Sequence, residues 1–452
     1  MTTPNSASIA ERNCQRFIAF RVLFNSRFYY PILAVLFLDL GVSASEYSLL
    51  NFVWAIVIVF AEVPSGVLAD RVGRRPLIIA AAVCMVLEML ALLFAPINGG
   101  LTLLLFCLVN RTLSGTAEAM ASGADESLVY DSLVLESRSA EWPNVMAAVM
   151  RWQSLGMVIA MLVGATVYDP QLMNKAMAYF GSSLRIEQSL TLRLPIVLNL
   201  ISAIVVLCLT LGMREPPGRH TGPHAVNRTG SAWRDIVAAG VWILRTPVAL
   251  FAIVGGVLID SVIRLFLTFG SVFYRLIDLP EASYGLIGAV MAGLGLVVAP
   301  IARKLVLTGS LLRNYMILAA LTMIGLLGIA FKIPLWGVLF TLPLAAAMTA
   351  LGFIISNTLN AKVSSDQRAT VLSFKGLIFN LGYGFASLFF ALGLRAMRDT
   401  GNADQAFASA IEVLPLWLLF TLALLALMFR RHRDMLQERP SSGEIDATKG
   451  NS

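Results

Sequence analysis

The stretch that decides the fold is PSGVLADRVGRRP, residues 64–76, which lies between two long apolar segments. It packs four charges into six residues: Asp70, Arg71, Arg74 and Arg75. The three arginines alone would fit a simple positive-inside anchor at a membrane surface. An anchor needs neither Gly66, whose missing side chain lets another helix approach closely, nor Gly73, which permits a tight turn between antiparallel helices. The stretch therefore predicts a functional loop between two membrane helices.

The composition indicates a membrane protein. Of the 452 residues, 58% are hydrophobic and 13% are charged, whereas an ordinary soluble domain carries about 25% charged residues. A membrane β-barrel would show alternating segments of roughly ten residues, and the sequence does not have them. Helices of about 20 apolar residues are the remaining way to cross a bilayer.

Apolar segments and turn signals predict twelve spans, with both ends of the chain on one side of the membrane. The spans are residues 17–40, 46–69, 76–96, 101–122, 143–168, 191–213, 246–273, 282–301, 312–331, 335–360, 368–393 and 408–430. The polar start of the chain does not resemble a cleaved signal peptide, so the first span is expected to remain.

The distribution of Lys and Arg orients the chain. Most of these residues lie in the segments on the side of the two termini, which the positive-inside rule makes cytoplasmic. We therefore expect a multi-pass protein of the cytoplasmic (inner) membrane. The net charge of +7 follows from this topology and is not gathered on a soluble face, so we expect no nucleic-acid partner.

The sequence predicts two halves, residues 1–213 and 236–452, joined by a cytoplasmic linker at 214–235. The linker is rich in Pro, Gly and basic residues and lacks an apolar period. His220 and His224 lie in it, but Gly222 and Pro223 between them prevent the helical turn that would align two imidazoles on a metal. We expect no metal.

The loop resembles the signature of the major facilitator superfamily. The matching residues are Gly66, Leu68, Ala69, Asp70, Arg71, Gly73, Arg74 and Arg75. The resemblance implies an all-α fold of twelve membrane helices in two six-helix halves. It also implies an inner gate in which Asp70 comes near the N-terminus of the eleventh helix. Independently, Ser364-Ser365-Asp366-Gln367 has the capping pattern that would start that helix.

The fourth span carries a second, weaker likeness to the superfamily, from Arg111 to Ala119, with Ser114 and Ala117 in place of the usual Gln and Gly. An arginine at this depth is costly and needs a partner or a role. The family role would be proton coupling with a nearby carboxylate, for which Asp260 ranks before Asp39 and Glu118. The alternative is a buried ion pair that only holds helices together.

Other polar residues at membrane depth complete the predicted cavity for coupling or substrate. The candidates are Asn25, Arg27, Tyr30, Arg111, Glu118, Asp260 and Arg264. Asp260 and Arg264 are four residues apart, so pairing within their own helix is an equally simple interpretation. Glu88 in the third span has no evident partner in the sequence.

These patterns predict a secondary transporter that moves a small organic solute by alternating access, coupled to protons, with export as one direction. Uptake of a polar or anionic metabolite with protons is an alternative, and so is a sensor or scaffold that does not transport. No phosphate loop and no catalytic constellation is seen, so we expect neither an enzyme nor a cofactor. The expected partners are the solute, protons and the bilayer, with the protein as a monomer.

Overall fold

The computed structural model describes residues 8–181, 185–216, 229–363, 367–398 and 403–437. Two predicted features, the histidines of the linker and the capping pattern at 364–366, lie outside these residues. Contacts between Cα atoms divide the chain into two units. Unit 1 holds residues 1–42, 53–232 and 280–289, and unit 2 holds residues 43–52, 233–279 and 290–452.

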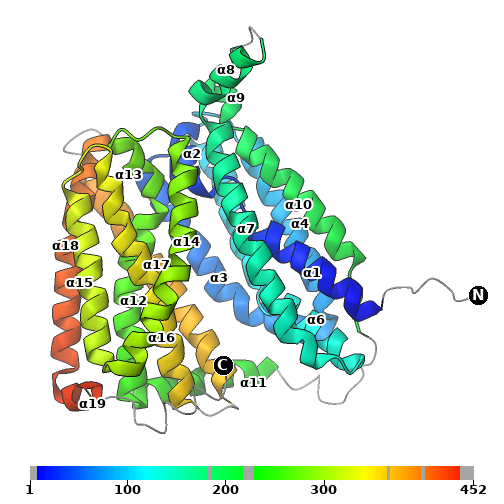
Figure 1. Ribbon diagram of the computed structural model, residues 1–452, viewed down its shortest axis with the longest axis vertical. Helices are drawn as coiled ribbons and strands as arrows, with labels where there is room; N and C mark the ends of the chain where they lie inside the picture. Colours follow the sequence, from blue (N-terminus) through cyan, green and yellow to red (C-terminus); the bar gives the residue numbers. More distant parts are fainter. Residues whose placement is uncertain (1–7, 182–184, 217–228, 364–366, 399–402, 438–452) are drawn as a thin grey trace, which may run out of the picture. The chain divides into compact units, whose positions relative to one another are not determined.

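The described residues form helices and connecting turns (Figure 1). The helices of unit 1 are α1 (Ile9–Asn25), η1 (Tyr30–Ile32), α2 (Leu33–Leu40), α4 (Arg74–Leu93), α5 (Leu101–Ala121), α6 (Ala124–Leu135), η2 (Ser139–Glu141), α7 (Trp142–Tyr168), α8 (Pro170–Tyr179), α9 (Gln188–Thr191) and α10 (Leu194–Gly212). The helices of unit 2 are α12 (Pro247–Thr268), α13 (Gly270–Leu276), α15 (Leu311–Ala330), η3 (Trp336–Phe340), α16 (Thr341–Lys362), α17 (Arg368–Arg398), α18 (Ala403–Met428), η4 (Arg430–His432) and α19 (Arg433–Gln437). Three helices have residues in both units: α3 (Ala44–Val72), α11 (Thr229–Arg245) and α14 (Ser283–Thr308).

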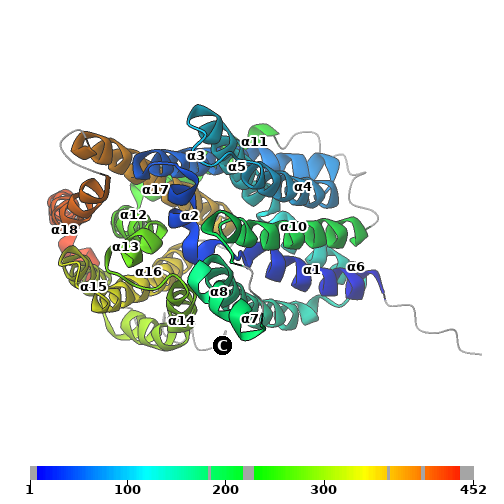
Figure 2. The same ribbon diagram turned by 90° about the horizontal axis from the view of Figure 1, so that it is seen from above.

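Unit 1 is a bundle in which α10 packs against both α1 and α4 (Figure 2). The helix α4 also packs along α5, and α1 packs along α7. Small residues allow these close approaches: a Cβ at Gly164 of α7 would lie 1.7 Å from the carbonyl oxygen of Phe28. The first span and α7 are therefore in backbone contact, as is common where membrane helices meet at glycine.

Unit 2 is organised around α12, which contacts α15, α16, α17 and α18. Thirteen of its 22 residues are buried, among them Asp260. A helix that is apolar on nearly every side and surrounded by other helices belongs at the centre of a bundle. The acidic side chain is thus held in the middle of unit 2.

The predicted spans are confirmed closely. Eleven segments of the described residues are long and apolar enough to cross a membrane, from Ile9–Leu40 to Gln405–Met428. Most of their ends lie within a few residues of the predicted ones. The predicted span not among these eleven is the fourth, which is α5, a helix of 21 residues whose polar members include Arg111 and Glu118. The chain is therefore an all-α, multi-pass membrane protein.

Two elements differ from the sequence prediction. The first span is not one helix, because α1 ends at Asn25 and helical structure resumes only with η1 at Tyr30. The predicted linker at 214–235 is also shorter, since α11 begins at Thr229. The sequence did not predict this start because the first turn of α11, Thr229-Gly-Ser-Ala, is small and polar like the linker before it.

Candidate transport site and loop motif

The loop motif forms the turn that the sequence predicts between α3 and α4. Gly73 has a φ of 104° and lies between the two helices. This conformation is readily available only to glycine, so the residue is required by the turn itself. Gly66 lies in α3, and among the described residues no atom of another helix comes within 4 Å of the position that a Cβ would take there. Asp70 is in the last part of α3, and its proposed contact with the eleventh helix stays a prediction.

The arginines at the end of the motif bind groups of unit 1. The Arg74 guanidinium pairs with Asp131 of α6 and donates to the carbonyl oxygen of Ser127 at 2.8 Å. Arg75 donates from Nη2 to the carbonyl oxygen of Leu211 at the end of α10, at 2.9 Å. Arg71 is exposed. Two of the three arginines therefore hold α4 to its neighbours, which a simple surface anchor would not do.

Glu215, just after α10, caps the first turn of α4. Its carboxylate oxygens accept the backbone N–H groups of Arg74 at 3.2 Å and of Arg75 at 2.7 Å. Free N–H groups and the helix dipole make this end of a helix favourable for an anion. Neither partner is evident from the sequence, because Glu215 lies 140 residues beyond Arg75 and Asp131 lies 57 residues beyond Arg74. The position of Glu215 directly after the sixth span was the only signal that could have suggested it.

The break in the first span contains the predicted cavity residue Arg27, and two others, Asn25 and Tyr30, border it. At this break, side chains form hydrogen bonds with backbone groups. The N–H of Phe28 donates to Asn199 Oδ1 of α10 at 2.9 Å, and Arg27 Nε donates to the carbonyl oxygen of Phe24 at 2.9 Å. Non-helical backbone at membrane depth is tolerated where protein groups satisfy it, and discontinuous helices of this kind line transporter sites. Asn25 is half-buried, and Tyr30 is 40% exposed.

Arg27 forms a buried ion pair with Glu88 of α4. Both side chains are almost completely inaccessible, at 4% and 0% exposure. Asn110 Nδ2 of α5 also donates to the backbone carbonyl of Glu88 at 2.9 Å. This pair supplies the partner of Glu88 that the sequence did not reveal. Because its guanidinium is buried in this pair, Arg27 stabilises the break and does not expose its charge to a cavity.

The two polar residues of α5 have different surroundings. The Arg111 guanidinium is buried and lies over the ring of Phe37, with its central carbon 4.6 Å from the ring centroid. Glu118 is exposed and interacts electrostatically with Arg21 and Arg27 of the first span. The structure thus places Glu118 near the broken helix. Asp39 was the third carboxylate proposed as a partner of Arg111. It accepts hydrogen bonds from the Tyr168 hydroxyl and, at 3.1 Å, from Gln188 Nε2.

Asp260 and Arg264 pair within α12, as the spacing of four residues allowed. Arg264 Nη2 lies 2.8 Å from Asp260 Oδ2, and Asp260 is buried. Arg264 also donates to Asn380 Oδ1 of α17 at 3.1 Å and lies over the ring of Tyr383. Lys375 of α17 interacts electrostatically with Asp260. This cluster brings three charges and two polar side chains together inside unit 2.

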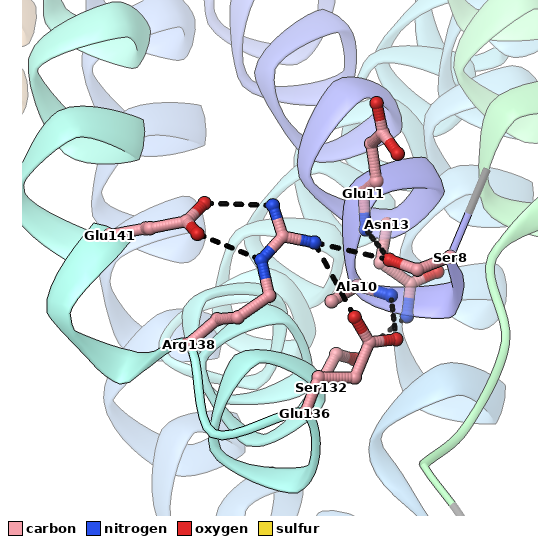
Figure 3. A network of polar contacts seen from close by, with 8 residues as sticks. All are labelled: Ser8, Ala10, Glu11, Asn13, Ser132, Glu136, Arg138 and Glu141. Atoms are coloured by element: carbon pink, nitrogen blue, oxygen red, sulfur yellow. Dashed lines mark hydrogen bonds and ion pairs between the residues drawn. The ribbon is translucent and has the colours of Figure 1, made fainter.

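A further polar network lies at the start of α1 (Figure 3). Arg138 makes a bidentate pair with Glu141, at 2.8 and 2.9 Å, and also donates to Ser8 Oγ at 3.2 Å. The backbone N–H of Ala10 donates to Glu136 at 3.0 Å. That hydrogen bond, with help from Ser8 and Arg138, holds the pKa of Glu136 below its usual range. The network ties the first turn of α1 to the segment between α6 and α7.

Comparisons with known proteins agree with this architecture. The family model described as Major Facilitator Superfamily matches residues 17–387. Among curated proteins, none matches the chain in sequence.

Several solved transporters have a similar fold. The nucleoside transporter NupG superposes with a TM-score of 0.69 and 13% identity, covering 94% of this chain and 99% of its own. A bacterial homologue of the human lysosomal transporter Spinster superposes with a TM-score of 0.60 and 17% identity, covering 96% of this chain and 97% of its own. A D-xylose–proton symporter superposes with a TM-score of 0.56 and 16% identity, covering 91% of this chain and 95% of its own. At these identities the likeness concerns the fold.

Proposed function

Because the chain belongs to the major facilitator superfamily, we propose that it is a secondary active transporter that moves a small organic solute by alternating access, coupled to protons. The likeness to solved transporters over almost the whole chain supports a transport role. The name of one of them, a D-xylose–proton symporter, supports protons as a coupling ion that this fold can use. The loop motif supports the same function, since a scaffold needs no such motif.

The observation that carries the proposal is the buried pair of Asp260 and Arg264 in α12. Ionisable side chains inside a membrane protein are expensive, and they commonly mark ion or substrate pathways. A carboxylate beside an arginine and within electrostatic range of Lys375 can release its proton when its surroundings change. Arg111 was proposed to act on Asp260, but the two residues lie in different units, and their interaction stays a prediction.

The site also bears on the substrate. Arginines that face a transport cavity would favour a negatively charged solute, the anionic case of the uptake alternative. Arg27 is bound to Glu88 and Arg111 is buried against Phe37, so these two residues give no support to an anionic solute. An uncharged polar or amphipathic solute fits the half-exposed Tyr30 and Asn25 better. Export and uptake are both compatible with such a solute.

We further propose that the protein lies in the cytoplasmic membrane as a monomer, with both termini in the cytoplasm. The positive-inside distribution of Lys and Arg supports this orientation. We propose no catalytic activity and no cofactor, in keeping with a family of transporters.

Replacement of Asp260 tests the coupling. In proteoliposomes, Asp260→Asn should abolish solute accumulation driven by a pH gradient but preserve passive exchange of the solute between compartments. Asp278→Asn is the matched control, because Asp278 is exposed in a turn of the same unit and asparagine tolerates its φ of 60°. If Asp260→Asn still concentrates solute under the gradient, Asp260 is not the coupling site and its pair with Arg264 is structural.

A further inference from the structure

One end of unit 1 carries a pocket that shares Arg75 with the loop motif. Its volume is about 670 Å³, within the range of small-molecule sites. Three segments form it, namely the start of α1, the start of α4 and the end of α10. The lining residues are Arg12, Arg16, Arg75, Leu211, Gly212, Met213, Arg214 and Glu215.

The pocket is strongly basic. Among the described residues, four arginines and one carboxylate, that of Glu215, line the pocket. The Glu215 carboxylate accepts hydrogen bonds from the first two N–H groups of α4, and the dipole of that helix adds partial positive charge at the same place. The net charge left around the pocket is therefore positive and favours an anion.

The arginines keep donors for a ligand. Arg16 donates to the carbonyl oxygen of Gly212, and Arg75 donates from Nη2 to that of Leu211. Each guanidinium has five N–H donors, so these contacts position the side chains without exhausting them. The buried Arg75 Nε has no hydrogen-bond partner among the described residues. Planar, forked donors of this kind are well suited to phosphate oxygens.

The position of the pocket indicates which kind of molecule would supply the phosphate. The pocket lies where two membrane helices begin and a third ends, at the end of unit 1 that the charge distribution predicts to be cytoplasmic. Leu211 lines the pocket and is 52% exposed, which suits contact with an acyl chain. Basic pockets between membrane helices on this side bind anionic lipid headgroups. We propose that this pocket binds the phosphate of an anionic phospholipid of the inner leaflet.

The proposal does not depend on transport and is tested by lipid binding to the purified full chain. The thermal midpoint of the protein is measured in mixed micelles as phosphatidylglycerol is titrated in, with phosphatidylcholine and inorganic phosphate as parallel arms. A ligand that binds the folded state raises this midpoint. We expect phosphatidylglycerol to stabilise the protein, and the other two arms to have little effect.

The test variant is Arg12→Gln/Arg214→Gln, which removes two pocket charges but spares Arg16 and Arg75, whose contacts hold the helices together. It should weaken the apparent affinity for phosphatidylglycerol by about thirtyfold. The matched control, Arg303→Gln/Lys304→Gln, removes two exposed charges from α14 and should leave the affinity unchanged. An equal loss of affinity for phosphatidylglycerol in both variants would overturn the proposal, because the loss would then depend on the net charge of the protein and not on this pocket. Equal stabilisation by inorganic phosphate would overturn the lipid as the ligand, and equal stabilisation by phosphatidylcholine would overturn the need for a negative charge.

Discussion

At the scale of single residues, the strongest feature of unit 1 is the pair of Arg27 and Glu88. The two charges lie on different helices, and neither is accessible. Taking two charges out of water is costly, and the pair offsets that cost only while both partners are present. The pair also fixes the non-helical residues between Asn25 and Tyr30, because Arg27 Nε simultaneously binds the Phe24 carbonyl. One ion pair thus holds the broken helix against α4.

Replacement of one partner should therefore be worse than replacement of both. We expect Arg27→Gln and Glu88→Gln each to lower the free energy of unfolding by about 3 to 5 kcal/mol, since each leaves an uncompensated buried charge. The double variant Arg27→Gln/Glu88→Gln should recover most of that loss. Reversible unfolding of the four proteins in mixed micelles measures the coupling. Strictly additive losses would show that the two side chains do not stabilise each other.

At the scale of elements, two arrangements position helices by binding their ends. Glu215 binds the first N–H groups of α4, and Arg138 with Glu136 binds the first turn of α1 (Figure 3). Helix ends leave backbone groups without partners inside the helix, so a charged side chain from another element can fix where the helix starts. Both arrangements lie within unit 1. They link the start of α4 to the segment after α10, and the start of α1 to the segment after α6.

The Glu136 contact predicts a pH dependence of stability. Its pKa is lowered in the folded protein, so its contribution is present at pH values above the unfolded pKa of about 4.3 and is lost as the pH falls through the folded pKa. Glu136→Gln should therefore lower the thermal midpoint near neutral pH, and its difference from the wild type should shrink on acidification below about pH 4.3. Glu187→Gln, at an exposed glutamate, is the control and should follow the wild type throughout. A constant difference between Glu136→Gln and wild type from neutral to acidic pH would contradict the assignment.

At the scale of the whole molecule, the account requires two arrangements of the chain that exchange during transport. The loop motif is the candidate for the element that biases one arrangement. The family resemblance implies that Asp70 comes near the start of the eleventh helix, and this contact stays a prediction. A carboxylate at a helix N-terminus is stabilised by the helix dipole, so its loss would shift the balance between the arrangements.

Asp70→Asn should then insert normally and reach wild-type abundance but transport about tenfold more slowly. Initial rates in proteoliposomes with equal amounts of protein measure the effect, with Asp278→Asn as the control. A wild-type rate in Asp70→Asn would reduce the role of the motif to the turn at Gly73 and the contacts of Arg74 and Arg75.

Sequence predicted the span boundaries well, because hydropathy alone decides how much chain a bilayer accepts. It also found the pair of Asp260 and Arg264, whose partners are neighbours on one helix. It could not find the pair of Arg27 and Glu88, whose partners are 61 residues apart.

The break in the first span was equally hidden. Its stabilising groups come from distant segments, such as Asn199, 171 residues from Phe28. The polar residues Asn25, Ser26 and Arg27 lie at the break, but apolar residues on both sides outweigh them, so hydropathy shows a single span. A sequence pattern can therefore predict contacts between residues that are close along the chain. Contacts between residues that only the fold brings together are found from the structure.

Solute counterflow tests the central claim, transport by alternating access, most directly. The solute is the compound from a metabolite panel that most raises the thermal midpoint of the purified protein. Proteoliposomes are loaded with the unlabelled solute and diluted into a trace of the labelled one, without any ion gradient. The account predicts that the labelled solute rises inside above its equilibrium level and then decays, because a carrier exchanges solute across the membrane. Entry at the rate of protein-free liposomes, without an overshoot, would contradict it.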